Sequence, residues 1–208
     1  MRDTAYVMQQ PAKSDRVLAL AREFPIVRPR DVEGIGVPRE YLLRLHRAGQ
    51  LERVGRGLYR LPNSPVTERH NFALVASRVP QSVICLLSAL VFHHVGTQNP
   101  FEVWIALKQG AWTPNFDYPP IRVVRFSGPS LTFGAMEHTI EGVKIKVYSP
   151  AKTVADCFKF RSKVGTELAI QALRECFREK KASMDELWEA AKICRVANVT
   201  RPYMESLS

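Results

Sequence analysis

The chain has 208 residues, of which 46% are hydrophobic, and it carries a formal net charge of +10 at pH 7. This hydrophobic content is sufficient for a folded core and argues against disorder, while the basic excess favours a polyanionic partner, either nucleic acid or an acidic surface. The longest apolar run, residues 83–92, is too short to span a bilayer, and residues 1–12 contain no signal-peptide core, so we expect a cytoplasmic protein.

Three short helices and a β-hairpin are predicted in the first 65 residues, after a loose arm at residues 1–13. The helices are expected at residues 14–24, 30–33 and 38–48, and the two strands at residues 51–54 and 58–61. Ser14 is a good N-cap, Pro25 ends the first helix, and Gly49 stops the third. The apolar face of the first helix comprises Val17, Leu18, Leu20, Ala21 and Phe24. This order of elements is typical of a winged helix-turn-helix.

Residues 66–208 are predicted to form a mixed α/β domain, which a linker at residues 62–65 joins to the first domain. Strands are expected at residues 102–107, 121–126, 137–140 and 143–148, with a further strand leading into a helix within residues 83–94. Helices are expected at residues 68–78, 149–160, 166–179, 184–195 and about 198–204. The predicted fold class is therefore α/β (α+β), with a winged helix-turn-helix at residues 1–65 and a mixed α/β domain with C-terminal helices at residues 66–208.

The third predicted helix has the two faces that a DNA recognition helix needs. At about 100° per residue, Tyr41, Leu42 and Leu45 fall on one side, and the opposite side is polar. The residues predicted to contact DNA are Arg39, Glu40, Arg44 and Arg47 on this helix and Arg53 and Arg56 on the hairpin. Because recognition helices read bases mainly through their N-terminal residues, Arg39 and Glu40 are the predicted readers.

The tip of the hairpin carries Arg56 between Gly55 and Gly57, where it can reach a phosphate or the minor groove. Leu43 also faces outward, as a thymine-methyl contact or an ordinary surface residue. The alternative interpretation is a solvated basic helix in a protein–protein module. Helix, turn, hairpin and charge agree with one another, which favours double-stranded DNA as the partner.

Two stretches carry a family resemblance. Residues 36–59 read GVPREYLLRLHRAGQLERVGRGLY and resemble the N-terminal domain of the abortive-infection AbiEi antitoxin family. Residues 147–158 read VYSPAKTVADCF and are similar to the C-terminal domain of that family. The likeness covers roughly residues 14–178, and the first stretch is the more specific of the two.

The resemblance implies a two-part protein of a type IV toxin–antitoxin system that defends against bacteriophage. The winged helix would repress its own operon by binding inverted repeats in the promoter, which favours a dimer on the DNA. The C-terminal domain would counter a nucleotidyltransferase-like toxin without forming a stable complex with it. A stand-alone regulator with a ligand-binding or partner-binding α/β domain would carry the same signature, and it remains the alternative.

The motifs of the relevant enzymes are absent from the sequence. The nearest approach to a nuclease pattern, Glu141 to Lys144, has a spacing one residue too long, and no paired aspartates, P-loop or GxGxxG motif occurs. The four cysteines are widely spaced in apolar or helical contexts, so neither zinc nor a disulfide framework is expected; they are Cys85, Cys157, Cys176 and Cys194. We therefore predict no enzymatic activity, no cofactor and no metal.

Several other residues have a functional and a structural interpretation, and the structural one is favoured. His93 and His94 are adjacent, so on a helix they cannot face one metal. Asp156 lies four residues after Lys152 and is expected to pair with it rather than to act in catalysis. Trp104 and Trp112 could stack on bases, but core or rim packing is the commoner role of such aromatics. The apolar face of residues 168–177 could bind a partner, but core packing of an amphipathic helix is favoured. The cations of residues 159–181 could extend the DNA-binding surface, meet an acidic partner or form an ordinary solvated face.

Overall fold

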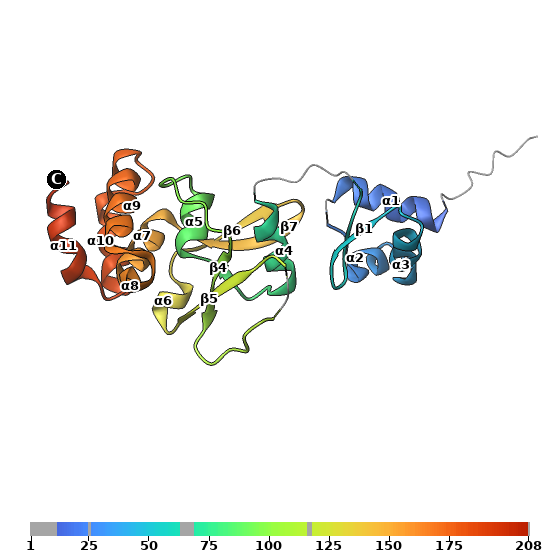
Figure 1. Ribbon diagram of the computed structural model, residues 1–208, viewed down its shortest axis with the longest axis horizontal. Helices are drawn as coiled ribbons and strands as arrows, with labels where there is room; N and C mark the ends of the chain where they lie inside the picture. Colours follow the sequence, from blue (N-terminus) through green and yellow to red (C-terminus); the bar gives the residue numbers. More distant parts are fainter. Residues whose placement is uncertain (1–11, 25, 63–68, 116–117, 208) are drawn as a thin grey trace, which may run out of the picture. The chain divides into compact units, whose positions relative to one another are not determined.

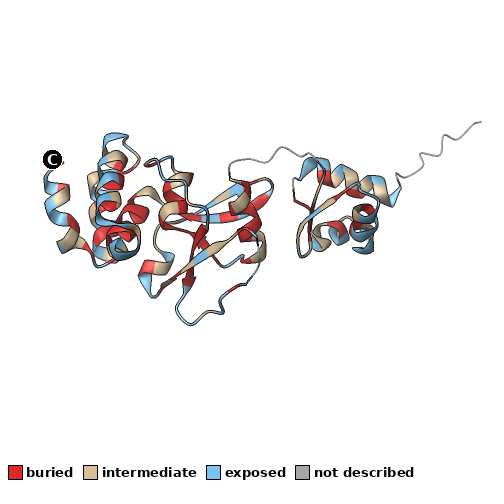
Figure 2. Ribbon diagram, in the orientation of Figure 1, coloured by how far each residue is buried: buried red, intermediate tan, exposed pale blue. Residues whose placement is uncertain are grey.

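The computed structural model describes residues 12–24, 26–62, 69–115 and 118–207. The chain divides into two compact units, Met1–Thr67 and Glu68–Ser208 (Figure 1). Each unit has its own hydrophobic core, as the buried residues in Figure 2 show, and each is described by itself below.

The first unit is a winged helix-turn-helix with the element order α1, α2, α3, β1, β2 (Figure 1). The elements are α1 (Lys13–Glu23), α2 (Pro29–Gly34), α3 (Glu40–Arg47), β1 (Glu52–Gly55) and β2 (Leu58–Arg60). The two strands pair antiparallel. Val27 and Tyr59 exchange two backbone hydrogen bonds of 2.7 and 3.0 Å between N and O, so the segment before α2 is tied to the hairpin.

The core of this unit draws on every one of its helices and on the hairpin. Its buried members are Val17, Ala21, Val27, Val32, Val37, Leu42, Leu45, Leu51 and Tyr59. The predicted amphipathic pattern of α3 is confirmed, because Leu42 and Leu45 are buried while the opposite side of the helix is exposed.

Three predicted details of the first unit are wrong. Ser14 is not the N-cap of α1, because the carbonyl of Ala12 already accepts a hydrogen bond from the Arg16 N–H and so starts the helix before the serine. Phe24 is an exposed, extended C-cap residue rather than part of the apolar face. Helix α3 begins at Glu40 and not at Pro38, whose carbonyl accepts from Tyr41 three residues on, as in a turn that leads into a helix. Pro25, residues 1–11 of the arm and residues 63–65 of the linker lie outside the described residues.

The second unit is a mixed α/β fold (Figure 1). Its strands are β3 (Val83–Ile84), β4 (Val103–Lys108), β5 (Ile121–Phe126), β6 (Ala135–Ile140) and β7 (Val143–Tyr148). Its helices are α4 (His70–Arg78), α5 (Leu86–Phe92), α6 (Pro129–Thr132), α7 (Pro150–Lys159), α8 (Arg161–Val164), α9 (Thr166–Arg178), α10 (Met184–Ile193) and α11 (Ala197–Glu205). The strands predicted from the sequence are confirmed, and the unpredicted elements are the single-turn helices α6 and α8.

The five strands form one sheet in the order β5-β4-β3-β7-β6. Strand β4 runs parallel to β5 and antiparallel to β3, while β3 runs parallel to β7 and β7 antiparallel to β6. Both faces of β4 are covered: Trp104 and Ala106 belong to the core shared with α5 and α7, and Val103, Ile105 and Leu107 are buried on the other face. Strands β5 and β6 are the two edges of the sheet.

The last helices, α7 to α11, gather at one end of the second unit (Figure 1). Ser149 caps α7, as predicted, by accepting a hydrogen bond from the Lys152 N–H. The buried face of α9 consists of Ala169, Ala172, Leu173 and Cys176, and the partly buried Leu168, Ile170 and Phe177 pack against the same core. The core interpretation of residues 168–177 is therefore confirmed. None of the helices formed by the described residues combines the length and hydrophobicity needed to span a bilayer.

Candidate nucleic-acid interface

The outer face of α3 is polar and lies fully at the surface. Glu40, Arg44 and Arg47 are exposed and fall within a sector of about 60° on the helical wheel. Leu43, 40% exposed, flanks this sector, and Leu42 and Leu45 hold the opposite side of the helix in the core. The packing of α3 on its own unit therefore leaves the predicted reading face open to a ligand.

Arg39 occupies the N-cap of α3 with helical dihedral angles (φ −58°, ψ −21°), and its side chain is exposed. It thus precedes the first turn rather than lying inside the helix, next to Glu40. At the N-terminus of a helix the unpaired backbone N–H groups and the helix dipole favour an anion. Arg39 adds a flexible cation there, a position suited to a base edge or a neighbouring phosphate.

The wing is a tight hairpin anchored to the core. Gly55 and Leu58 pair directly, which leaves a two-residue turn of Arg56 and Gly57. Gly57 has φ +69°, a left-handed conformation that glycine adopts without strain. Leu58 and Tyr59 are buried behind the turn, so exposed Arg56 is held at the tip by a fixed base.

The other two hairpin arginines differ from each other. Arg60 donates from Nε and Nη2 to the Glu52 carboxylate at 3.0 and 2.9 Å, an ion pair that occupies the guanidinium. Arg53 is exposed and donates only one hydrogen bond, from Nε to the Gly55 carbonyl at 3.2 Å. Arg53 and Arg56, the two hairpin residues predicted to contact DNA, are thus the hairpin arginines with guanidinium groups open to a ligand.

Tyr41 was predicted to face the core with Leu42 and Leu45 but is only partly buried, and both Tyr41 and His46 make contacts at this surface that the sequence did not predict. The Arg44 guanidinium stacks on the Tyr41 ring, 4.7 Å from its centroid, which orients Arg44 on α3. His46 joins α3 to the hairpin through Nδ1 and the Leu51 carbonyl, 3.0 Å apart. The three-residue spacing of Tyr41 and Arg44 is the sequence signal that could have found the first contact.

The charge of this surface is not cancelled locally. Over the described part of the chain, no ion pair joins Arg39, Arg44, Arg47 or Arg56 to a carboxylate. The six residues predicted to contact DNA are all exposed and lie on two elements, α3 and the hairpin, of one small rigid core. Two adjacent cationic elements of this kind can bind a polyanion through phosphates and present side chains to base edges.

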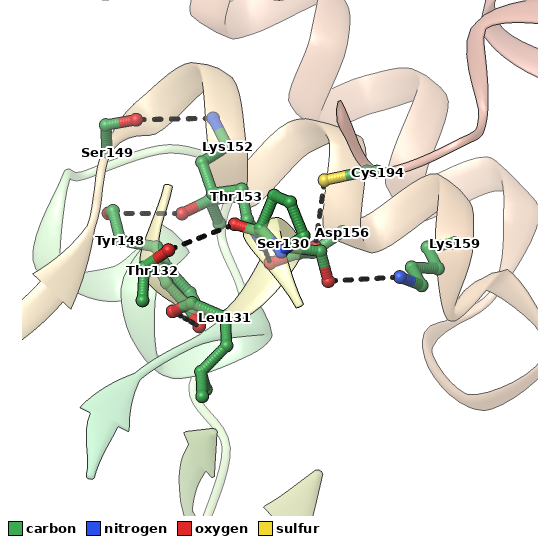
Figure 3. Close-up of polar contacts among 11 residues, drawn as sticks. Ser130, Leu131, Thr132, Tyr148, Ser149, Lys152, Thr153, Asp156, Lys159 and Cys194 are labelled. Carbon is green, nitrogen blue, oxygen red and sulfur yellow. Dashed lines mark hydrogen bonds and ion pairs between the residues drawn. The ribbon is translucent and has the colours of Figure 1, made fainter. Parts of the chain in front are cut away.

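In the second unit, the predicted pairing of Lys152 and Asp156 is confirmed, and both side chains are completely buried (Figure 3). Cys194 of α10 donates a weak hydrogen bond to the second Asp156 oxygen at 3.5 Å. The Lys152 ammonium also lies over the Tyr148 and Phe126 rings, 4.1 and 4.7 Å from their centroids. Burial raises the pKa of Asp156 to about 6, and the Lys152 charge offsets part of that rise. A carboxylate so enclosed cannot reach a substrate. Both residues of the pair lie on α7, and their contacts with Cys194, Tyr148 and Phe126 join this helix to its neighbours.

The two adjacent histidines turn to different partners. His93 and His94 follow the end of α5 rather than lying within it. His93 Nε2 lies 2.7 Å from the Tyr148 carbonyl, and burial lowers the pKa of His93. His94 Nε2 lies 2.8 Å from the Arg69 guanidinium on the N-terminal side of α4. Within the described ranges, no group of three or more His, Cys, Asp or Glu side chains could hold a metal ion.

The four cysteines and the tryptophans Trp104 and Trp112 are the remaining residues that the sequence analysis considered. All four cysteines are buried and free, in line with the prediction that each behaves as a small hydrophobic residue. Trp104 packs in the core, which is the favoured of its two interpretations, whereas Trp112 is 75% exposed, which contradicts core packing there.

Comparison with solved structures supports this description of the fold. The crystal structure of the RV2827C protein from Mycobacterium tuberculosis matches with a TM-score of 0.59 at 14% sequence identity, over 96% of this chain and 81% of that chain. At this identity the similarity concerns the fold alone. No curated protein matches the sequence at a significant level.

A family model described as "Transcriptional regulator, AbiEi antitoxin" matches residues 15–62. The matched range includes α2, α3 and the hairpin and nearly all of α1, so it contains every residue of the exposed basic surface. Over residues 15–62, the first unit of this protein is therefore similar to the AbiEi antitoxin family of transcriptional regulators.

Proposed function

We propose that this protein is a DNA-binding transcriptional repressor that regulates its own operon and acts as the antitoxin of a type IV toxin–antitoxin system. The observation that carries the proposal is the exposed, uncompensated basic face of α3 beside Arg56 of the wing, within a domain of a regulator family. Its predicted ligand is double-stranded DNA with inverted repeats, bound by two copies of the first unit.

The contacts divide into reading and holding. Arg39 and Glu40 read base edges from the N-terminal end of α3, where a guanine offers arginine two acceptors and a cytosine offers glutamate a donor. Arg44 and Arg47, further along the same face, hold phosphates with Arg53 and Arg56 of the hairpin. Leu43 contacts a thymine methyl beside them.

The antitoxin half of the proposal rests on the second unit. That unit is larger than a repressor needs for dimerisation, and residues 147–158, which form the end of β7 and most of α7, carry the resemblance to the antitoxin family. We propose that it counters a nucleotidyltransferase-like toxin without a stable complex and without catalysis of its own. In the competing proposal, a stand-alone regulator, the same unit senses a ligand.

The DNA-binding half is tested on the protein's own promoter. The purified full-length protein is expected to shift promoter DNA, and the logarithm of its affinity is expected to fall linearly with the logarithm of salt concentration. Each phosphate contact contributes about 0.9 to the magnitude of that slope. The four phosphate-holding arginines of one first unit therefore contribute about 3 to 4. The measurement is a titration in a mobility-shift assay at several salt concentrations.

Two controls make this result decisive. The double variant Arg44→Ala, Arg47→Ala is expected to lower the magnitude of the slope by about 2 for each bound copy of the first unit. The control variant Arg22→Ala, which removes an exposed arginine at the end of α1, is expected to leave the slope unchanged. No shift of promoter DNA, or an affinity that is equal at low and high salt, contradicts the proposal.

A further inference from the structure

Three aromatic side chains of the second unit are unusually exposed. Phe101 is 82%, Trp112 75% and Tyr118 57% accessible, and all three lie within 18 residues of sequence. Large aromatics are normally buried for most of their area, because their transfer from water is strongly favourable. Their clustering around one strand pair singles out this part of the surface, which we call the stacking surface.

The topology aligns these residues along β4 and β5. The two strands are parallel, with Val103 opposite Ile121, so the connection at residues 109–120 returns from their C-terminal end to their N-terminal end. Trp112 therefore lies near the C-terminal end, and Phe101 and Tyr118 lie near the other. A six-residue strand is about 20 Å long, and Trp112 lies at the opposite end of this strand pair from Phe101 and Tyr118. Figure 2 shows most of this connection as exposed.

Hydrogen bonds hold Trp112 in its exposed position. Arg125 of β5 donates from Nη2 to the Thr113 hydroxyl at 2.6 Å and from Nη1 to the Lys108 carbonyl at 3.3 Å. On the other side of the tryptophan, the Ala111 N–H donates to the Lys108 carbonyl at 3.0 Å. Because both neighbours of Trp112 form these hydrogen bonds, the backbone that carries the exposed indole is held at the surface.

Cations outnumber carboxylates in this segment by three to two. Lys108, Arg122 and Arg125 are the cations of residues 101–126, and Glu102 and Asp117 are the carboxylates, of which Asp117 lies outside the described residues. Glu102 binds Arg122 at 2.6 Å between Oε1 and Nε, and among the described residues neither Lys108 nor Arg125 forms an ion pair with a carboxylate. The Arg122 guanidinium also stacks on the Trp104 ring at 4.8 Å.

We propose that the stacking surface binds single-stranded nucleic acid. Exposed aromatic rings at the two ends of a strand pair suit unpaired bases several nucleotides apart on one chain, since every base has a π-face and stacking needs no particular sequence. Lys108 and Arg125, at the Trp112 end of the two strands, suit the phosphates. A duplex cannot use the rings in this way, because its bases are already stacked on one another, so this site is distinct from the duplex-reading face of α3. The spread of the rings over the length of a strand favours this ligand over a protein partner.

The test uses the full chain carrying Arg39→Ala and Arg44→Ala, two substitutions that disable the proposed duplex binding by the first unit. In this background, 5′-fluorescein-labelled oligothymidylate and oligouridylate 12-mers and a 12-base-pair duplex are titrated by fluorescence anisotropy. Both single strands are expected to bind at least tenfold more tightly than the duplex. Adding Trp112→Ala is expected to weaken single-strand binding about tenfold, the effect of losing one stacked base. The difference between the two oligonucleotides shows whether RNA or DNA is preferred.

Two further variants guard against trivial results. Met136→Ala removes a 45% exposed side chain from β6, the opposite edge of the same sheet, and is expected to leave binding within twofold. Trp112→Phe keeps an aromatic ring and is expected to retain binding, but it removes the most exposed of the three tryptophans and with it the quenching of intrinsic fluorescence by the oligonucleotide. Equal affinity for single strands and duplex, or equal affinity with Trp112→Ala, overturns the proposal.

Discussion

Single residues of the basic surface differ in what their positions allow. Arg39 stands at the N-terminus of α3 beside Glu40, where recognition helices approach base edges. Arg56 stands on a two-residue turn whose glycine neighbours leave it surrounded by solvent. The first position favours discrimination between sequences, and the second favours contact with any phosphate or minor groove.

This difference predicts opposite behaviour for two alanine variants. Arg39→Ala is expected to cost about 1–3 kcal/mol on the operator and much less on scrambled DNA, because a bidentate contact to guanine is lost only where the guanine is present. Arg56→Ala is expected to weaken both DNAs about equally. Binding of both variants to both DNAs is the measurement, and equal losses on the two DNAs for Arg39→Ala would contradict its assignment as a reader.

The buried Asp156 predicts a dependence of stability on pH. Its folded pKa of about 6 lies above that of an unfolded aspartate, about 3.9, so the folded chain holds the extra proton between these values. The resulting contribution is fully present below about pH 4 and is lost as the pH rises through about 6. Relative to Asp156→Asn, which cannot titrate at this position, the free energy of unfolding of the wild type should fall by about 2 kcal/mol from pH 4 to pH 6.5. Urea denaturation at a series of pH values measures this, and a pH-independent difference contradicts it.

A glycine beside the same pair provides a second stability prediction. Gly134 has φ +68°, and a Cβ there would lie 2.8 Å from Lys152 Cβ and 2.9 Å from Ser149 Oγ. Gly96 has φ +75° with nothing within 4 Å of such an atom, so Gly96→Ala carries only the backbone strain of a positive φ, about 1–2 kcal/mol. Gly134→Ala adds the clash with α7 and should be less stable by a further 1–3 kcal/mol or so. Equal unfolding midpoints for the two variants would contradict this prediction, because they would show that α7 shifts to accommodate the added Cβ with no loss of stability.

At the scale of elements, the features predictable from sequence are those with a strong local signal. The helical period of Leu42 and Leu45, the proline and serine at the start of α7 and the Glu141–Gly142 turn of β6 and β7 each fix an element locally. The first residues of α1 and α3 were less well predicted, because helix ends depend on which carbonyl first accepts a hydrogen bond. The single-turn helices α6 and α8 are too short to show a period at all.

Contacts that join distant elements could not be predicted. The Lys152–Asp156 pair follows from a spacing of four residues, but nothing local indicates that Cys194, 38 residues away, completes its surroundings. The exposure of Trp112 likewise depends on Arg125 of the neighbouring strand, which fixes the turn that presents it. Tertiary contacts of this kind decide whether an aromatic packs inward or faces solvent.

At the scale of the whole molecule, the two units allow two separable tasks. The proposed DNA-reading face lies entirely in the first unit, and the buried ion pair and the proposed stacking surface lie in the second. Each unit has its own core, so a change on the exposed face of α3 is expected to leave the second unit folded. If the protein is both repressor and antitoxin, loss of DNA binding should therefore not abolish antitoxicity.

Growth rescue tests this separation directly. The proposed nucleotidyltransferase-like toxin, sought in the neighbouring gene, is co-expressed with the full-length wild type or with the Arg39→Ala, Arg44→Ala variant, each from a promoter that this protein does not repress. Both proteins are expected to restore growth to a similar extent, because the second unit is intact in each. Equal soluble expression of the two proteins is the control, and a negative pull-down is uninformative because no stable complex is expected. Toxicity relieved by neither protein at matched expression leaves the stand-alone regulator, whereas rescue by the wild type alone means that antitoxicity acts through α3 and DNA.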